Sequence, residues 1–147
     1  MSQGFTEAAN ADPTGRDPGQ LVYSVENGLL GTHPITHGRN DSERVRRVVT
    51  FTGQSLKTDD GTALLVLGDS AIDYVPPPPS FTARSASGRS QGVALARGAG
   101  RVVVLSEAAV LTAQLDENGN PFGMREGEND NAHFALNIMH WLSRLLP

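Results

Sequence analysis

Two uninterrupted apolar runs do most to limit the folds open to this chain. One runs from Thr62 to Leu67 and the other from Val102 to Leu105. Neither run alternates apolar with polar residues, so each predicts a short strand that is covered on both faces. Strands of this kind are typical of parallel sheets with helices on either side. The two runs therefore favour an α/β protein.

The segments around these runs complete the predicted order of elements. Residues 45–51 combine β-branched and aromatic side chains and predict a further strand, whereas residues 90–98 and 107–115 are compatible with helix. Strands that alternate with helices predict an α/β fold with a mainly parallel sheet. The chain has few strands for such a sheet, which would leave an edge open. An open edge predicts a homodimer.

A longer helix is predicted near the end of the chain, over residues 131–146. Its apolar face consists of residues at helical spacing, namely Phe134, Ile138, Trp141, Leu142 and Leu145. Asp130 or Asn131 is placed to cap the first turn. The same spacing predicts one polar stripe along this helix, which consists of His133, Asn137, His140 and Arg144.

Length and composition predict one globular domain. The chain has 147 residues, of which 38% are hydrophobic, and this suffices for a single core and not for two. Residues 1–20 are polar and contain Pro13 and Pro18. They predict a flexible segment ahead of a domain that spans residues 21–147.

Charge and hydropathy narrow the partners and the location. The net charge is -4 and no run of lysine or arginine occurs, which argues against nucleic acid as a partner. No apolar stretch reaches membrane-spanning length and the first residues do not resemble a signal peptide. We therefore expect no membrane association and a cytoplasmic location. The absence of cysteine excludes disulfides, thiolate zinc sites and a cysteine nucleophile.

Gly68, Asp69 and Ser70 end the first apolar run, and Ser70 has two interpretations. A nucleophilic serine is often held on a sharp turn after a buried strand, but these three residue types are also ordinary turn residues. Ser106 and Glu107 follow the second run. Because ligands bind at the carboxyl ends of parallel strands, we expect both strand ends to face one crevice. The alternative role of Glu107 is to stabilise the start of a helix.

A polar loop after residue 115 is a candidate calcium site. Asp116, Asn118 and Asn120 stand at alternate positions, a spacing that suits calcium through carboxylate and amide oxygens. Pro121 stands where a calcium loop of this type has glycine. The alternative is a solvated acidic loop.

A pair of histidines is a candidate zinc site. His33 and His37 are spaced for zinc, which needs a third or fourth ligand, and only Asp41 and Glu43 are near in sequence. The alternative, a turn at Pro34, needs no metal.

Residues 28–39, 48–56, 98–114 and 131–146 carry a resemblance that covers most of the chain from about Leu21 onward. They resemble uncharacterised bacterial proteins related to the class I glutamine amidotransferase-like, flavodoxin-like domains. The resemblance implies a three-layer α/β sandwich with a flavodoxin-like sheet. Such domains begin with a strand and a helix that this chain lacks, so the resemblance also implies a sheet truncated at the N-terminus, with Met1 at a position that lies inside longer proteins of this class. Amidotransferases of this class need a cysteine, which leaves a binding scaffold or a different chemistry.

A second resemblance is local. "GDSAID" at residues 68–73 and "DNAH" at residues 130–133 are similar to the first and last blocks of the GDS-type (SGNH) esterases and lipases. The resemblance implies that Ser70 is the nucleophile, His133 the base and Asp130 the residue that orients it. The N–H of Ser70 and the amide of Asn129 are the candidate oxyanion donors.

Two functions remain open on these grounds. The first is a hydrolase of an ester or lactone, conceivably an acyl-homoserine lactone, in which Ser70 attacks or in which a carboxylate and calcium activate water. The second is a non-catalytic amidotransferase-like domain that binds a ligand or a protein. The two esterase-like blocks favour the first, and the missing cysteine and N-terminal unit favour the second.

Overall fold

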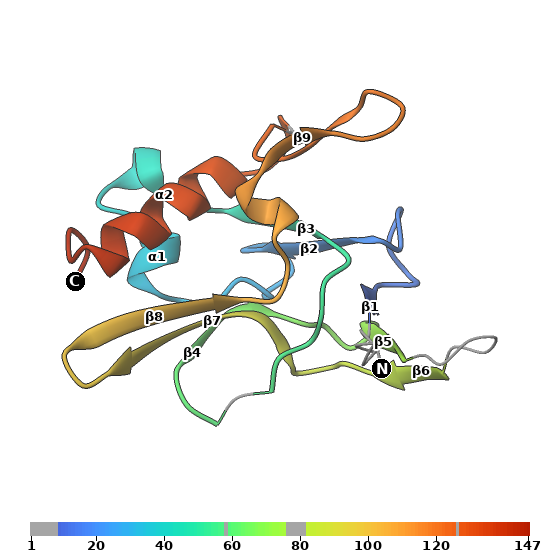
Figure 1. Cartoon of the computed structure of the whole chain (residues 1–147), viewed down its shortest axis with the longest axis horizontal. Helices are drawn as coiled ribbons and strands as arrows, with labels where there is room; N and C mark the ends of the chain where they lie inside the picture. Colours follow the sequence, from blue (N-terminus) through green and yellow to red (C-terminus); the bar gives the residue numbers. More distant parts are fainter. Residues whose placement is uncertain (1–8, 58, 76–81, 126) are drawn as a thin grey trace, which may run out of the picture.

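The fold is mainly β, and its strands pair only in antiparallel fashion within the residues that the structure describes. A computed structural model describes residues 9–57, 59–75, 82–125 and 127–147. These residues form four small sheets (Figure 1), and every strand pair is antiparallel. Two of the sheets border the apolar core. One pairs β2 (Gln20–Ser24) with β3 (Arg47–Phe51), and the other consists of β4 (Thr62–Val66), β7 (Ser90–Arg97) and β8 (Gly100–Leu105).

Two further sheets lie outside this core. In Figure 1 one of them lies at the opposite end of the molecule from the β7–β8 hairpin. It consists of β1 (Ala9–Ala11), β5 (Ile72–Val75) and β6 (Thr82–Ser85), with β5 in the middle. The other is the hairpin of β9 (Ala113–Leu115) and β10 (Pro121–Gly123).

Helix is confined to four short or medium elements in the described residues. The 12-residue helix α2 (Asn131–Leu142) packs against α1 (Pro34–His37) and against β8. Two 3-10 turns, η1 (Asp41–Glu43) and η2 (Ala109–Leu111), complete the set. Figure 1 places α1 and α2 together on one side of the β7–β8 hairpin.

The apolar core lies between α2 and the β2–β3 and β4–β7–β8 sheets. Phe134, Ile138 and Trp141 on α2 are buried there, together with Tyr23 on β2 and Leu64 on β4. The apolar face predicted for this helix is therefore confirmed at these three positions of α2, whereas Leu142 and Leu145 are exposed. Burial also raises the pKa of the Tyr23 hydroxyl, because the charged form loses its hydration.

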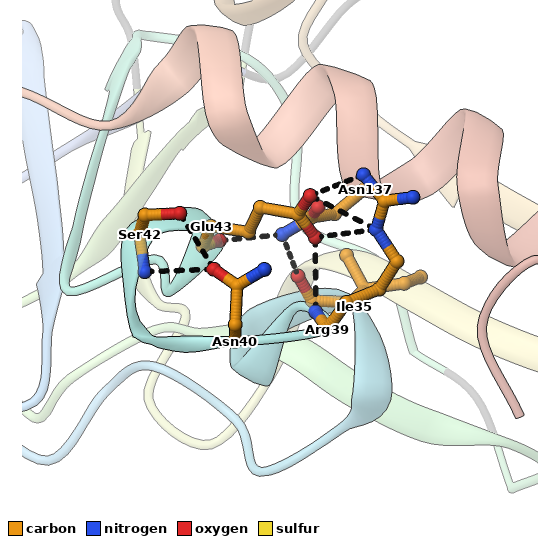
Figure 2. A network of polar contacts seen from close by, with 6 residues as sticks. All are labelled: Ile35, Arg39, Asn40, Ser42, Glu43 and Asn137. Atoms are coloured by element: carbon orange, nitrogen blue, oxygen red, sulfur yellow. Dashed lines mark hydrogen bonds and ion pairs between the residues drawn. The ribbon is translucent and has the colours of Figure 1, made fainter.

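Asn137 joins α2 to the loop that contains α1 and η1 (Figure 2). Its Nδ2 donates to the carbonyls of Ile35 (2.9 Å) and Glu43 (2.8 Å). Beside it, Arg39 and Glu43 form an ion pair at the surface. The helical spacing predicts that Asn137 lies on one polar stripe with His133, His140 and Arg144. Asn137 is buried instead, so it does not belong to an exposed stripe. The loop that contains α1 and η1 explains the difference, because the carbonyls of Ile35 and Glu43 need a donor and Asn137 supplies it.

The predicted three-layer α/β sandwich with a parallel, flavodoxin-like sheet is wrong, and with it the resemblance to amidotransferase-like domains. Strands are indeed found at β4, β8 and β3, close to the predicted positions. However, β7 lies between β4 and β8 and pairs antiparallel with both. The uninterrupted apolar run of β8 is not covered on both faces either, because Val102 and Val104 are exposed. An apolar run indicates a strand and does not fix the direction of its neighbours.

Two segments predicted as helix contain strands and no α-helix. Residues 90–97 form β7, and residues 107–115 form η2 and β9. Alanine and glutamine are good helix formers, but intrinsic propensity is a weak preference that pairing with neighbouring strands outweighs.

The first described residues form a strand. Residues 1–8 lie outside the described part, and β1 begins at Ala9 inside the segment for which the sequence predicts flexibility. Asn10 and Ala11 are buried there.

In the described part of the chain no helix has both the length and the hydropathy needed to cross a membrane.

Candidate functional site

A row of buried polar side chains connects three sheets. The Thr50 hydroxyl on β3 donates to Gln91 Oε1 (2.6 Å), and Gln91 Nε2 on β7 donates to Asn10 Oδ1 (2.6 Å). Asn10 Nδ2 on β1 donates in turn to Asp73 on β5. All four side chains are buried. Because each hydrogen bond points toward Asp73, the last member of the row must be an acceptor, and a carboxylate meets that requirement.

Asp73 receives two further donors from outside this row. The Ser55 hydroxyl donates to Asp73 Oδ2 (2.7 Å), and Arg89 Nη1 lies 3.5 Å from the same oxygen. Arg89 Nη2 also donates to the carbonyl of Ser55 (3.2 Å). Only 5% of Asp73 is exposed, and a buried charge is tolerated when it is paired and hydrogen-bonded. The carboxylate is therefore well satisfied by the protein itself.

A cavity of about 340 Å³ opens beside Asp73, and we call it the arginine pocket. Arg84 on β6 stands directly opposite Asp73 on β5, so the two side chains lie on one face of the sheet. Arg84 is exposed, and none of the described residues forms an ion pair or hydrogen bond with its side chain. The pocket is lined by Gln54, Ser55, Asp73, Val75, Arg84, Ser85 and Arg89.

The arginine pocket has more cationic donors than the protein uses. It contains two guanidinium groups and one carboxylate, and that carboxylate already accepts from Asn10 and Ser55. In addition, Arg89 Nε is buried and has no hydrogen-bond partner among the described residues. A larger cavity of about 520 Å³ beside the loop at residues 12–17 lacks this excess, because its lining has three carboxylates and two arginines. The arginine pocket is therefore the better candidate for an anion site.

Ser70 and Asp69 lie in the turn after β4, and the side chain of each has a hydrogen-bond partner on another segment. The Ser70 side chain is hydrogen-bonded to the carboxylate of Asp12. Partial burial acts to raise the pKa of Asp12, but the hydrogen bonds from Thr14 and Ser70 outweigh this effect and lower it. Asp69 Oδ1 accepts from the hydroxyl of Ser87 (2.7 Å). Neither residue is hydrogen-bonded to a histidine among the described residues.

The structure does not bring Ser70, His133 and Asp130 into one hydrogen-bonded triad. Asp130 Oδ2 accepts from the backbone N–H groups of Arg46 (2.7 Å) and Arg47 (3.0 Å), and it ties the start of α2 to β3. His133 is exposed on α2, and no described residue is hydrogen-bonded to its ring. Their predicted catalytic roles stay predictions. The resemblance to GDS-type esterases is not supported by any family match.

Asn129 lies at the start of α2. Its Oδ1 accepts from the N–H of Asn131 (2.9 Å), and its Nδ2 donates to the carbonyl of Gly123 (3.2 Å). Asn129 and Asn131 together supply the side-chain contacts that hold this helix start against β3 and β10, because Asn131 also bonds both backbone groups of Val49. Asp130 therefore lies at the predicted capping position but binds β3 with its side chain.

Ser106 and Glu107 follow β8, which ends at the same end of its sheet as β4 because both pair antiparallel with β7. The Ser106 hydroxyl donates to the carbonyls of Gln54 and Gln91. The Glu107 carboxylate accepts from the N–H groups of Ala109 and Val110, so it stabilises the start of η2. The crevice between these strand ends was predicted from a parallel sheet, which the described strands do not form, and it stays a prediction. The arginine pocket lies elsewhere, between β5, β6 and the loop at Gln54.

The two candidate metal sites are turns in the described structure. The carboxylate of Asp116 accepts from the N–H groups of Asn118 and Asn120 (2.8 Å each) and from Asn120 Nδ2, which lowers its pKa. His33 Nδ1 accepts from the N–H of Ile35 (3.2 Å) at the start of α1, and burial lowers the pKa of this histidine. Within the described residues no group of three or more His, Cys, Asp or Glu side chains is placed to hold a metal.

Sequence reasoning missed the residues of the arginine pocket. The available signal was Asp73, a charged residue inside the apolar stretch "AIDYV". A charge at such a position predicts a buried, paired carboxylate. Its partners could not be found in the same way, because Asn10, Ser55 and Arg89 lie on other segments. Comparison of the chain with known protein families, with curated proteins and with solved structures gives no match.

Proposed function

We propose that this protein binds a small anion in the arginine pocket. The observation that carries the proposal is the excess of cationic donors there: Arg84 and Arg89 line a cavity of about 340 Å³ whose single carboxylate is already satisfied. A volume of this order suits a small molecule rather than a protein segment. The function is therefore that of a ligand-binding domain.

The chemistry of arginine selects the ligand. A guanidinium group presents its donors in a planar fork that matches the two oxygens of a carboxylate or of a phosphate. Arg89 is held in place by Asp73 and Ser55, so its orientation is set before a ligand arrives. Arg84 is exposed and free to close over the ligand from β6. A carboxylate or phosphate group between the two arginines would meet donors from both.

Ester or lactone hydrolysis has less support from the geometry. The sequence predicts it from Ser70, His133 and Asp130, but Ser70 and Asp130 have separate hydrogen-bond partners and His133 has none among the described residues. The carboxylate beside Ser70 is that of Asp12, whose lowered pKa makes it a weak base, so the serine hydroxyl is poorly activated. We therefore place anion binding first.

The test is a calorimetric titration with two probes, inorganic phosphate and succinate. We expect the wild-type protein to bind at least one of them and Arg84→Gln to bind it at least about tenfold more weakly, since a charge-assisted bond contributes about 1.5–3 kcal/mol. Arg97→Gln is the matched control, because it removes the same charge from an exposed residue on β7. Binding of phosphate alone would identify a phosphate ligand, and binding of succinate alone a carboxylate. No binding of either probe, or equal loss in both variants, would contradict the proposal.

A further inference from the structure

β8 is an edge strand with unpaired backbone groups. The order β4–β7–β8 leaves one side of β8 without a neighbouring strand. Gly100, Val102 and Val104 stand opposite Arg97, Leu95 and Val93, and the N–H of Ser106 continues this alternation by bonding Gln91 (3.0 Å). Even-numbered residues therefore bond to β7, and odd-numbered residues direct their N–H and C=O groups away from it. Among the described residues none bonds to the backbone of Arg101, Val103 or Leu105.

The outer face of the same strand is apolar. Val102 is 39% exposed and Val104 is 41% exposed, and they lie beside Leu95 and Val93 of β7 on one face of the sheet. A shallow hollow of about 180 Å³ is lined on this face by Leu56, Lys57, Val93, Leu95 and Val104. A long edge strand with an apolar face is a template for pairing with another strand.

We propose that β8 pairs antiparallel with β8 of a second copy of this chain, about a two-fold axis at Val103. In this register Val102 of each copy stands opposite Val104 of the other, so four exposed valines meet on one face. The unpaired backbone groups of Arg101, Val103 and Leu105 find partners at the same time. An isologous contact of this kind closes as a dimer.

Charge complementarity selects a second copy as the occupant. Arg144 is exposed and donates to the carbonyl of Ala99 at the hairpin end of β8. In the proposed register, Ala99 stands opposite Glu107 of the second copy. The Glu107 carboxylate is partly exposed and retains lone pairs beyond the two bonds it accepts from η2. Each end of the paired strands therefore brings an arginine beside a carboxylate.

This dimer differs in its physical basis from the one that the sequence predicts. The sequence argument relied on an incomplete parallel sheet, which the structure does not contain. The edge of β8 offers unpaired hydrogen-bonding groups together with apolar side chains. Another exposed apolar surface, on α2 at Leu136 and Met139, offers side chains alone.

The test is the mass of the protein in solution, measured by light scattering over a wide range of concentration. We expect the wild type to reach twice the 15.6 kDa of a single chain, Val102→Lys to remain at 15.6 kDa, and Met139→Lys to behave as the wild type. Met139 is the matched control, because it is 62% exposed on α2 and receives the same charge. Circular dichroism checks that each variant is folded.

Arg144→Glu provides a second variant that leaves the β8 sequence intact. It places a carboxylate opposite Glu107 of the second copy, so we expect a shift toward monomer that added salt reduces. A wild type that stays monomeric, a Val102→Lys protein that still forms the dimer, or loss of the dimer in Met139→Lys would each overturn the proposal. If Val102→Lys does not fold, an unchanged dimer in Arg144→Glu would overturn it.

Discussion

Replacement of Asp73 by asparagine tests the physical account of the candidate site. The carboxylate accepts from Asn10 at one oxygen and from Ser55 and Arg89 at the other. An asparagine side chain has one oxygen, and its NH2 group would face one of these donors. Asn10 cannot turn its amide around without losing the bond from Gln91 to its oxygen.

The size of the effect follows from this geometry. The Ser55 hydroxyl can rotate and accept from the new NH2 group, but either Asn10, which is buried, or Arg89, which is partly buried, then loses its acceptor. An unsatisfied buried donor costs about 1–3 kcal/mol, and hydrogen bonds to a charged group contribute more than neutral ones. We therefore expect Asp73→Asn to lower the free energy of unfolding by about 2–4 kcal/mol.

Urea denaturation measures this quantity, with fluorescence of Trp141, the single tryptophan, as the probe. Asp60→Asn is the control, because Asp60 is 66% exposed in its ion pair with Arg97 and the charge change is the same. We expect the control to change the free energy of unfolding by less than about 0.5 kcal/mol. If Asp73→Asn were no more destabilising than the control, the argument from the direction of the buried hydrogen bonds would be refuted.

Two further predictions concern groups outside the pocket. The hydrogen bonds from Arg39 lower the pKa of Glu43 from 4.5 to about 2, so its contribution to stability is complete above pH 4.5 and is lost as the pH falls toward 2. The difference in urea midpoint between the wild type and Glu43→Gln should therefore shrink over that range, and a constant difference would contradict the assigned cause. For Ser70→Ala, we expect hydrolysis of a short ester and of an acyl-homoserine lactone to equal that of the wild type, because the Ser70 side chain is hydrogen-bonded to Asp12, whose lowered pKa makes it a weak base; activity lost in a folded Ser70→Ala protein would restore the serine mechanism.

Several elements could be predicted from the sequence because local residue patterns determine them. The apolar runs at β4 and β8 and the helical spacing of α2 each identify an element close to its observed place. Strand direction is not a local property, and the interpretation of residues 90–98 as helix removed the strand that separates β4 from β8. The signal for a hairpin was present in "RGAGR", since Gly98 has a positive φ of 56° in the two-residue turn.

The site was harder to predict than the fold because its residues come from distant segments. Asn10, Ser55, Asp73 and Arg89 meet only when three sheets are assembled. Some of the predicted site residues, in contrast, are turn-forming types whose side chains bond to neighbouring backbone. Glu107 at η2 and Asp116 in the β9–β10 turn are examples, and for both the sequence offered this structural role as the alternative.

The most direct test of anion binding is an NMR titration that observes the arginine Nε–H signals while inorganic phosphate or succinate is added. Arg89 Nε is buried and unpartnered among the described residues, so a ligand in the arginine pocket should shift its signal together with that of Arg84. The signal of Arg97 should stay in place, because this arginine lies on β7 outside the arginine pocket and is paired with Asp60. Saturable shifts confined to Arg84 and Arg89 are the result that the account predicts. Shifts of equal size at all three arginines, or none at any of them, would contradict it.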